Sequence, residues 1–350
     1  MQYTLLGRTG LAVSRLSLGT FTFSQPGGAL KSVNKVDPQV GEKLVNLALD
    51  AGVNLFDTAD RYANGDAEVI LGKALRTRRH EAVIVTKGGL RSGDSLLESG
   101  LSKRHLMNAI DASLQRLGTD HVDVYLAHRN DEIAPLEETL VALDDMVRMG
   151  KARYIGFSNW PAWKVASALE FQRANGLAKF CHGQMYYSLI GRDIEGEYAS
   201  MSDHYGLGLT VWSPLAMGFL TGKYTRKNVR DPSSRFVELG VIPLDSEAGF
   251  KAVDMMRPIA VAHKVSVAQV ALAWLLSKPR VSSIIIGATQ TSQLEENLRA
   301  ADVTLTAREL RDLDALASPT LPYPASHAWV GQDSRLAVAL GQPVLKSSHE

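Results

Sequence analysis

The chain has 350 residues, 45% of them hydrophobic, which is enough to bury a large core in one big domain or two ordinary ones. Lysine and arginine number 38 and aspartate and glutamate 37, so no field exists that would attract nucleic acid or an anionic membrane surface. The single cysteine, Cys181, fits a reducing compartment as a small buried strand residue, and the lack of a leader or membrane-length apolar run predicts an unprocessed cytoplasmic protein.

Short β-rich runs recur along the chain, each followed by a longer segment with apolar residues three and four apart. Segments 40–52 and 102–118 have this helical spacing and end in Gly52 and Gly118, as helix C-caps often do. Each strand is a nearly continuous apolar run, as expected when both faces are buried. The alternation therefore predicts an α/β fold, a closed (β/α)8 TIM barrel, as one domain over residues 1–350. The predicted strands are residues 16–20, 54–58, 82–87, 122–128, 152–158, 178–184, 207–213 and 281–287.

Two stretches depart from a plain barrel. Residues 222–248 are polar and glycine-rich, and the tail from Ser318 onward has few periodic apolar residues. Because long irregular stretches in compact domains are usually functional or disordered, we expect large loops and a C-terminal tail over the C-terminal face. No GxGxxG follows the first strand, which weighs against an open, doubly wound dinucleotide-binding domain.

Polar residues close most of the predicted strands. In a (β/α)8 barrel the chemistry lies at the C-terminal ends of the strands, so these side chains are expected to meet on one face. Any one of them alone would more often be a cap for the next helix. Asp60 and Arg61, by contrast, are expected to be loop residues that face solvent or each other. The strand-end residues are Asp57, Lys87, His128, Ser158 with Asn159, Gln184 and Ser213.

Three roles are open to Lys87: an amine that forms a Schiff base, a cation that shifts the pKa of a neighbouring group, or a lysine whose ammonium reaches water. Asp57 lies one strand earlier and is placed to keep Lys87 charged, which disfavours the Schiff base. Tyr62 can return over the rim to the same point, where the cation would stabilise its phenolate. His128 adds a hydrogen-bond donor suited to orienting a carbonyl oxygen.

This group would protonate a carbonyl oxygen, but it contains no nucleophile, no recognisable metal-ligand spacing and no hydrolase triad. The species that attacks the carbonyl carbon would then be a cofactor hydride, so the sequence should also contain a nicotinamide site. Ser158, Asn159 and Gln184 have side chains that suit a carboxamide. Trp212 ends a strand where its indole could stack on a flat ring, although a lone tryptophan is more often core.

Seven motifs follow one another along the chain: NLFDTADRY, VIVTKGG, VDVYLAH, IGFSNW, GQMYYSL, VWSPLAMGFLTGKY and IIIGATQTSQLEEN. In this order they resemble the aldo-keto reductase family over nearly the whole chain, and the ordered set is highly specific. The resemblance is strongest for the branch of bacterial oxidoreductases and voltage-gated potassium channel β-subunits. It implies a (β/α)8 barrel with NADPH or NADH lying across its C-terminal face.

The resemblance also implies a role for each matched residue. Tyr62 would be the general acid, Lys87 would lower its pKa, Asp57 would pair with that lysine, and His128 would orient the substrate oxygen. Within the cofactor site, the loop after the seventh strand would cross the pyrophosphate, and the run from Gly287 would take the adenosine. The matched cofactor positions are Thr20, Asp57, Ser158, Asn159, Gln184, Trp212, Ser213, Pro214, Leu215, Ala216, Lys223, Arg235, Gly287, Ala288, Thr289, Gln293, Glu296 and Asn297.

Cofactor preference depends on one departure from the family pattern. Many NADPH-preferring members carry a cation just after the matched glycine to hold the 2′-phosphate, whereas this chain has Ala288, Thr289 and Gln290. The channel-subunit branch binds NADP without that cation, using serine and glutamine. We therefore favour NADP and keep NAD as the alternative.

The substrate is expected to be a small-molecule aldehyde or ketone, with no metal at the site. Arg129 could prefer a polar or anionic substituent. Aromatic residues near a barrel rim could wall an apolar pocket, although they are as often packing. The aromatic candidates are Phe21, Phe23, Trp160, Tyr323 and Trp329.

Two other functions compete with the reductase. A cofactor-sensing regulatory subunit resembling the channel-associated relatives would depend on cofactor occupancy, and slow turnover leaves no mark in a sequence. A Schiff-base lyase fails because Asp57 would keep Lys87 charged and because the cofactor motifs would have no purpose. The sequence leaves a homo-oligomer open.

Overall fold

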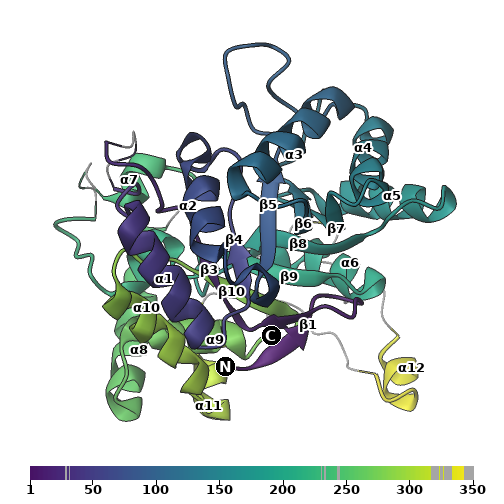
Figure 1. Cartoon of the computed structure of the whole chain (residues 1–350). Coiled ribbons are helices and arrows are strands. Elements are labelled where there is room, and N and C mark those ends of the chain that lie inside the picture. The colour runs from purple at the N-terminus through teal and green to yellow at the C-terminus, as the bar shows by residue number, and fades with distance from the viewer. Residues whose placement is uncertain are drawn as a thin grey trace.

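Eight parallel strands form a closed barrel in the computed structural model, which describes residues 1–27, 30, 32–229, 231, 234–242, 245–316, 323, 326 and 333–342. Each strand pairs with the next along the chain, and β10 pairs with β3 to close the ring. Figure 1 shows the helices arranged around these strands. The predicted (β/α)8 fold is confirmed. The barrel strands are β3 (Leu16–Gly19), β4 (Leu55–Asp57), β5 (Val83–Gly88), β6 (Val122–Ala127), β7 (Ala152–Ser158), β8 (Phe180–Tyr186), β9 (Gly208–Trp212) and β10 (Val281–Ile286).

The barrel strands fall where the sequence predicts them, with shifts of at most two residues at either end. Their continuous apolar runs are buried on both faces because helices cover the outside and side chains fill the inside. Strand β5 is buried along its whole length, and Lys87, its last residue but one, is fully buried. Because both faces of the strands are buried, polar side chains at the strand ends are expected to lie at the C-terminal mouth of the barrel.

Helices cover the outside of the barrel and begin and end at sequence signals. Asp37 and Ser102 cap the first and third helices with side-chain oxygens, and Gly52 and Gly118 follow them with φ of 82° and 63°. The helices are α1 (Pro38–Asp50), α2 (Asp66–Leu75), α3 (Lys103–Leu117), α4 (Leu136–Arg148), α5 (Ala162–Ala174), α6 (Glu197–Tyr205), α7 (Arg235–Leu239), α8 (Ser246–His263), α9 (Val267–Leu276), α10 (Thr291–Leu298), α11 (Ala307–Leu316) and α12 (Ser334–Ala339).

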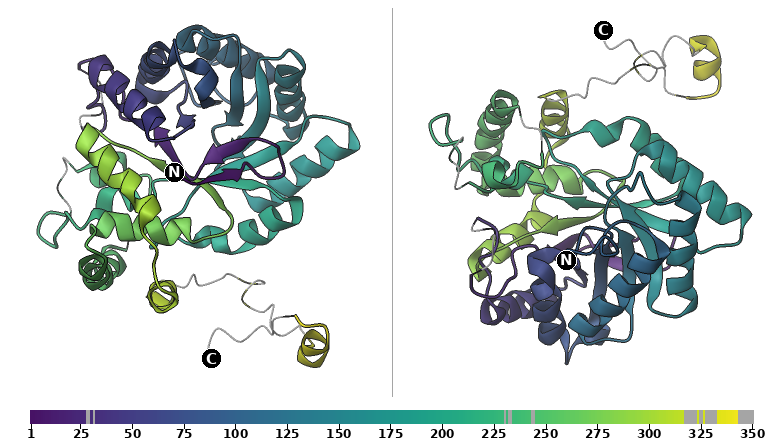
Figure 2. Two further views of the ribbon diagram at one scale, coloured as in Figure 1. Left: turned by 60° about the horizontal axis from the view of Figure 1, so that its bottom comes forward. Right: turned by 90° about the horizontal axis from the view of Figure 1, so that it is seen from above.

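A hairpin that the sequence did not reveal closes the N-terminal end of the barrel. Its antiparallel strands are β1 (Tyr3–Leu5) and β2 (Ala12–Ser14), too short to stand out as apolar runs. Leu6 and Val13 are fully buried in a cluster with the barrel-interior residues of β4, β5 and β6. The left view of Figure 2 shows the hairpin across this end. The hairpin does not cover the opposite, C-terminal end of the barrel, where barrels of this kind bind their ligands.

The structure describes parts of the two irregular stretches. Segment 222–248 contains α7 and the start of α8, so its described part is not structureless. Of the tail that was expected over the C-terminal face, the structure describes Tyr323, Ser326 and residues 333–342, and Figures 1 and 2 show α12 apart from the barrel. The rest of that prediction lies outside the described residues. Of the residues of α12 only Ala337 is buried, and Leu336 and Val338 are exposed.

Cys181 lies in β8 and is buried, as predicted, and burial raises the pKa of its thiol to about 12. Within the part of the chain that the structure describes, no single helix is long and apolar enough to cross a membrane. Helices α8 and α9 pass that test only as a pair, and they are bent by 93° against each other.

Candidate active site

Lys87 and Asp57 form a buried ion pair at the C-terminal ends of adjacent strands. The Lys87 Nζ donates to Asp57 Oδ2 at 2.8 Å, to the Thr58 carbonyl at 2.6 Å and to the Tyr62 hydroxyl at 3.2 Å. Lys87 is fully buried and Asp57 is 3% exposed. An ammonium group has three N–H donors, so all of them are used. The amine is held as a charged group beside the phenol.

The turn after β4 brings Tyr62 to this lysine. Tyr62 begins a short 3₁₀ segment (Tyr62–Gly65), in which Ala63 and Asn64 have positive φ angles of 47° and 55°. Two consecutive non-glycine residues in the left-handed region are strained, and such strain clusters at functional sites. The Arg61 side chain donates to Asn64 across the turn. The Tyr62 phenol is therefore positioned by a turn whose backbone conformation is rare for residues other than glycine.

Burial and charge act against each other on the pKa values of this group. Burial raises the pKa of Tyr62 above its usual value, and Lys87 opposes that rise without cancelling it. The expected lowering by Lys87 is thus present as a contribution, but the net direction differs because desolvation is larger. Burial also lowers the pKa of Lys87, but Asp57 and Tyr62 together raise it above its usual value. Lys87 is protonated throughout the neutral range.

His128 follows β6 and faces the same phenol. Its ring centroid lies 5.8 Å from that of Tyr62, with the rings at 76°. Burial, Lys87 and Arg129 hold the pKa of His128 well below its usual range, so the imidazole is neutral. Its Nδ1 has no hydrogen-bond partner among the described residues. A neutral imidazole offers one donor and one acceptor, which suits orienting a substrate oxygen.

A chain of hydrogen bonds joins the ion pair to the predicted nicotinamide residues. Gln184 Nε2 donates to the second carboxylate oxygen of Asp57 at 2.7 Å, and the Ser158 hydroxyl donates to the Gln184 carbonyl at 2.9 Å. Asn159 Nδ2 donates to Ser158 Oγ at 2.9 Å, and Trp212 Nε1 donates to Asn159 Oδ1 at 3.0 Å. Both Asp57 oxygens therefore accept hydrogen bonds. The chain of bonds links the C-terminal ends of β4, β7, β8 and β9. The sequence did not reveal the Gln184 bond, because 127 positions separate its two partners.

These groups line a cavity of about 1640 Å³ at the barrel mouth. That volume exceeds the roughly 300–1,000 Å³ typical of drug-sized ligand sites, so it has room for a dinucleotide and a substrate. The described residues of the loop after β9 carry further strain at its wall: Ser213 and Met217 have φ of 53° and 55°. The predicted cofactor residues that line the cavity are Asp57, Ser158, Asn159, Gln184, Trp212, Ser213, Pro214, Leu215, Lys223, Arg235, Gly287, Ala288, Thr289, Gln293, Glu296 and Asn297.

Two predicted cofactor residues do not line the cavity. Thr20 is fully buried, and its hydroxyl donates to the backbone carbonyl of Asp57 at 3.1 Å. Ala216 is 1% exposed and packs in the core below the loop. Both residues thus stand behind the cavity wall, where they support residues that do line it.

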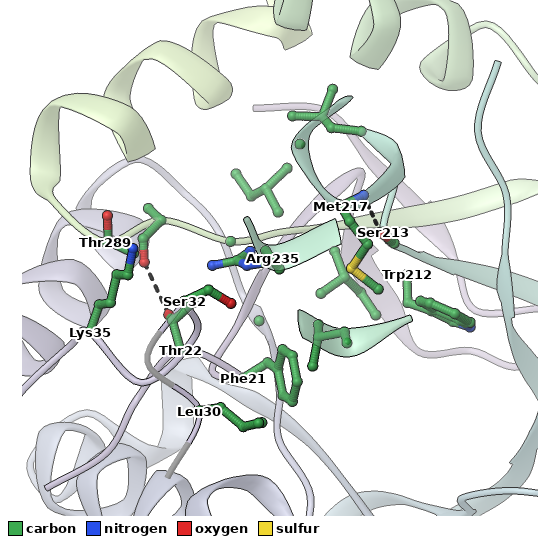
Figure 3. Close-up of a pocket in the computed structure, with 18 of the residues that line it drawn as sticks. Phe21, Thr22, Leu30, Ser32, Lys35, Trp212, Ser213, Met217, Arg235 and Thr289 are labelled. Carbon is green, nitrogen blue, oxygen red and sulfur yellow. Dashed lines mark hydrogen bonds between the residues drawn. The ribbon is translucent and has the colours of Figure 1, made fainter. Parts of the chain in front are cut away.

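The donor set of the cavity fits a diphosphate. Lys223 and Arg235 both line it, and neither forms an ion pair with any residue that the structure describes. Burial, Arg235 and Lys35 lower the pKa of Lys223, and burial lowers that of Arg235. Figure 3 shows Arg235 and Trp212 together with Phe21 around the cavity. Unpaired cations in one cavity suit a bound anion with two or more charges.

Of the predicted substrate residues, Phe21 and Arg129 line the cavity, and Phe21 packs edge-on against Tyr62 at 4.9 Å. Phe23 and Trp160 do not line it, and their assignment is wrong for a physical reason. Phe23 is fully buried against Gly41, and Trp160 is 2% exposed between Phe157 and Phe180. Tyr323 is 79% exposed, and Trp329 lies outside the described residues.

Asp60 contradicts its prediction as a solvent-facing loop residue. It is 6% exposed, and neither carboxylate oxygen has a hydrogen-bond partner within the described chain. Its backbone N–H donates to the Lys87 carbonyl at 3.1 Å, which pulls the residue inward. Burial and the nearby Glu68 raise the pKa of Asp60 to about 7. Arg61 is exposed, as predicted.

The strand-end rule missed one side of the cavity. The long connection between β3 and α1 contributes part of the wall, although no polar residue there ends a strand. Its length was the available signal, because long connections in compact domains are often functional. The lining residues from this loop include Thr22, Gly27, Leu30, Ser32, Asn34 and Lys35.

The fold and the site define a class: (β/α)8-barrel proteins with a phenol beside a buried lysine and a nucleotide-sized cavity at the C-terminal face. Residues 15–318 match the aldo/keto reductase family. The chain therefore belongs to the aldo/keto reductase family, a family of oxidoreductases, and the resemblance seen in its motifs is confirmed.

Similar proteins carry two kinds of name. A probable voltage-gated potassium channel subunit beta of Oryza sativa subsp. japonica is 40% identical over 315 residues, which cover 87% of this chain and 92% of that protein. A putative voltage-gated potassium channel subunit beta of Schizosaccharomyces pombe is 35% identical over 331 residues, covering 91% and 94%. Versiconal hemiacetal acetate reductase of Aspergillus parasiticus is 34% identical over 345 residues, covering 93% and 99%.

Proposed function

We propose that the chain is an NAD(P)H-dependent reductase of small-molecule aldehydes or ketones. The observation that carries the proposal is the hydrogen bond from the fully buried Lys87 ammonium to the Tyr62 hydroxyl at the wall of a nucleotide-sized cavity. When bound, the reduced nicotinamide supplies a hydride to the carbonyl carbon. The chain's own residues supply the proton and the geometry.

Tyr62 donates its phenolic proton to the carbonyl oxygen of the substrate. The phenolate that remains lies 3.2 Å from the Lys87 ammonium, whose charge stabilises it. Asp57 keeps that ammonium charged, and Gln184 fixes the carboxylate of Asp57. In the reverse direction the phenolate takes the proton of an alcohol, so the reaction is reversible.

His128 and Phe21 position the substrate. The neutral imidazole donates a hydrogen bond to the carbonyl oxygen and so directs it toward the phenol. The Phe21 ring covers the other side of Tyr62 and limits the access of water to it. Arg129 lines the cavity beside His128 and would favour a polar or anionic substituent.

The cofactor would be held along the cavity in three parts. Ser158, Asn159 and Gln184 would take the carboxamide, with Trp212 against the ring. Lys223 and Arg235 would take the pyrophosphate, and the segment from Gly287 would take the adenosine. We favour NADP over NAD as the cofactor.

Steady-state kinetics test the proposal. Purified protein is mixed with an activated aromatic aldehyde and with NADPH or NADH in turn, and nicotinamide absorbance is followed. We expect aldehyde-dependent oxidation of the cofactor that Tyr62→Phe reduces by at least 100-fold, since general acid catalysis contributes about 10²–10⁴-fold. Consumption of neither cofactor above the Tyr62→Phe rate overturns the reductase.

A second candidate is a cofactor-sensing regulatory subunit with slow turnover. It is favoured by the potassium channel subunit beta named among the relatives at 40% identity. The two candidates differ in turnover: the regulatory subunit binds the cofactor tightly but turns over far more slowly than a typical enzyme with every member of a broad carbonyl panel. A panel member reduced at the typical enzyme rate of about 1–10³ per second decides for the reductase.

A further inference from the structure

Lys35 is a cation at the cavity wall that lies outside the family motifs and matches none of the predicted cofactor positions. Lys35 comes from the connection between β3 and α1 and lines the same cavity as Thr289. Figure 3 shows its side chain extending toward Thr289, at the end where the adenosine would lie. At this end the segment after β10 offers Ala288, Thr289 and Gln290, none of which is charged. The loop therefore brings a positive charge to a place where the strand end has none.

The backbone of Lys35 is fixed relative to that strand end through Thr22. The N–H groups of Lys35 and Val36 both donate to the Thr22 carbonyl, at 3.2 and 3.1 Å. The Thr22 hydroxyl in turn donates to the carbonyl of Ala288 at 3.1 Å. Thr22 is 2% exposed, so this link is protected from water. A single buried residue thus ties the base of Lys35 to the residue before Thr289.

The outer part of the same loop is held from the opposite side of the cavity. Ser32 donates from both its backbone N–H, at 2.9 Å, and its hydroxyl to the Glu238 carboxylate of α7. Ser32 is 8% exposed. The segment that carries Lys35 is therefore anchored both at Thr22 and at α7.

The charges around Lys35 favour a bound anion. Lys35 makes no ion pair with the described residues, and it contributes to lowering the pKa of Lys223 after burial and Arg235. Glu296, a half-buried carboxylate, also lines the cavity and would repel a phosphate there. Thr289 and Gln293 are already joined to each other by hydrogen bonds of 2.9 and 3.0 Å. A cation would stabilise an anionic group at this end, and Lys35 is the one that the loop provides.

We propose that Lys35 recognises the 2′-phosphate of NADP at the Thr289 end of the cavity and thereby sets the preference for NADP over NAD. The inference rests on the proposed function, because it deepens the cofactor site of the same enzyme. A lysine ammonium is a compact charge on a flexible stem and suits a phosphate that it meets from a loop. Lys223 and Arg235 remain for the pyrophosphate.

Binding of two nucleotide fragments tests the proposal without turnover. The dissociation constants of adenosine 2′,5′-bisphosphate and adenosine 5′-monophosphate are measured on the full chain by calorimetry. We expect the bisphosphate to bind at least tenfold more tightly to the unsubstituted protein. Lys35→Met should remove about tenfold of that preference, because hydrogen bonds to charged groups are the stronger ones, and Lys35→Arg should keep most of it.

Two controls separate this effect from general changes in charge or stability. Lys43→Met, on the exposed face of α1, should leave both constants unchanged. Lys223→Met should weaken both nucleotides alike, because both carry the 5′-phosphate. Melting temperatures of all four variants check that each one folds.

The outcomes distinguish Lys35 from the wider proposal. If Lys35→Met keeps the preference, or if the unsubstituted protein binds both fragments equally, the role of Lys35 is wrong while the cofactor site stands. If neither fragment binds, the cofactor site itself and the role of Lys35 both fail. A bisphosphate preference without any carbonyl turnover would uphold Lys35 and overturn the reductase.

Discussion

At the scale of single residues, the site is organised by one buried ammonium. All three donors of Lys87 are occupied by Asp57, Thr58 and Tyr62, and the second oxygen of Asp57 is held by Gln184. A fully buried charge is costly unless it is paired and hydrogen-bonded, so each partner contributes to stability as well as to the proposed chemistry. A pair of variants that both lack activity should therefore differ in stability, according to whether a buried charge is left without a partner.

Lys87→Met should cost about 3–5 kcal/mol of unfolding free energy, because it leaves Asp57 buried without its partner. The double variant Lys87→Met with Asp57→Asn should recover much of that loss, since no buried charge remains. Neither variant should reduce carbonyl compounds. Urea unfolding and cofactor oxidation, measured on both, check the two effects. A double variant as unstable as the single one would show that the ion pair does not govern stability here.

Asp60→Asn should change how stability depends on pH. The pKa of Asp60 is raised to about 7 in the folded state against 3.8 for the ordinary carboxyl. The folded state therefore binds more protons between these values, and stability falls as the pH rises through that window. The protein should lose about 2 kcal/mol relative to Asp60→Asn between about pH 5 and pH 8. Urea unfolding of both proteins at each pH measures it, and parallel profiles would contradict the buried, unpaired carboxylate.

The burial of Asp60 could not be predicted from residue types alone. The strand-end rule brought Asp57, Lys87, His128 and Gln184 to one face because strand ends in a barrel converge. Asp60 lies beyond a strand end and was expected to face solvent or Arg61, yet it is buried, and its backbone N–H donates to the Lys87 carbonyl. The direction of a side chain in a turn depends on tertiary contacts of this kind. These contacts leave no periodic pattern of apolar residues in the sequence.

At the scale of elements, strands were predictable and connections were not. The barrel strands are continuous apolar runs, and this pattern placed all of β3 to β10. The hairpin of β1 and β2 is two three-residue strands, too short for any period to show. The described residues of the loop that carries Lys35 form no helix and no barrel strand. The loop's place at the cavity therefore depends on tertiary hydrogen bonds and on the burial of Phe23, Val33 and Val36.

The packing of α2 against α3 gives a prediction at this scale. A Cβ on Gly72 would lie 2.2 Å from the backbone oxygen of Leu117, where no flexible side chain can move away. Glycine to alanine in a helix usually stabilises by about 1 kcal/mol, whereas overpacking costs about 1–3 kcal/mol. We expect Gly72→Ala to destabilise by about 1–2 kcal/mol in urea unfolding. Lys73→Ala, on the exposed side, is the control and should change little; a stabilised Gly72→Ala would refute close packing.

At the scale of the whole molecule, the two ends of the barrel have different tasks. The hairpin fills the N-terminal end with Leu6 and Val13, and the cavity opens at the other end. In barrels of this kind the bottom face serves stability and the top face serves chemistry. The treatment of residues 1–350 as one domain stays a prediction, as does the cytoplasmic location.

Leu6→Ala should separate these two ends. Removing a fully buried leucine leaves a cavity in the barrel interior, so we expect a loss of about 2–5 kcal/mol of unfolding free energy. Affinity for adenosine 2′,5′-bisphosphate should stay within about twofold, because the substitution lies at the opposite end. Urea unfolding and calorimetry on the same sample check both. A large loss of affinity in a protein that remains folded would show that the two ends are coupled.

The most direct test of the central claim follows the transferred hydrogen itself. NADPH labelled with deuterium at the nicotinamide C4 is incubated with the protein and an aromatic aldehyde, and the alcohol is examined by mass spectrometry. We predict deuterium at the carbinol carbon of the product with the unsubstituted protein and almost no alcohol with Tyr62→Phe. An alcohol without deuterium from either C4 position, or equal yields from both proteins, would contradict a reductase in which Tyr62 donates the proton.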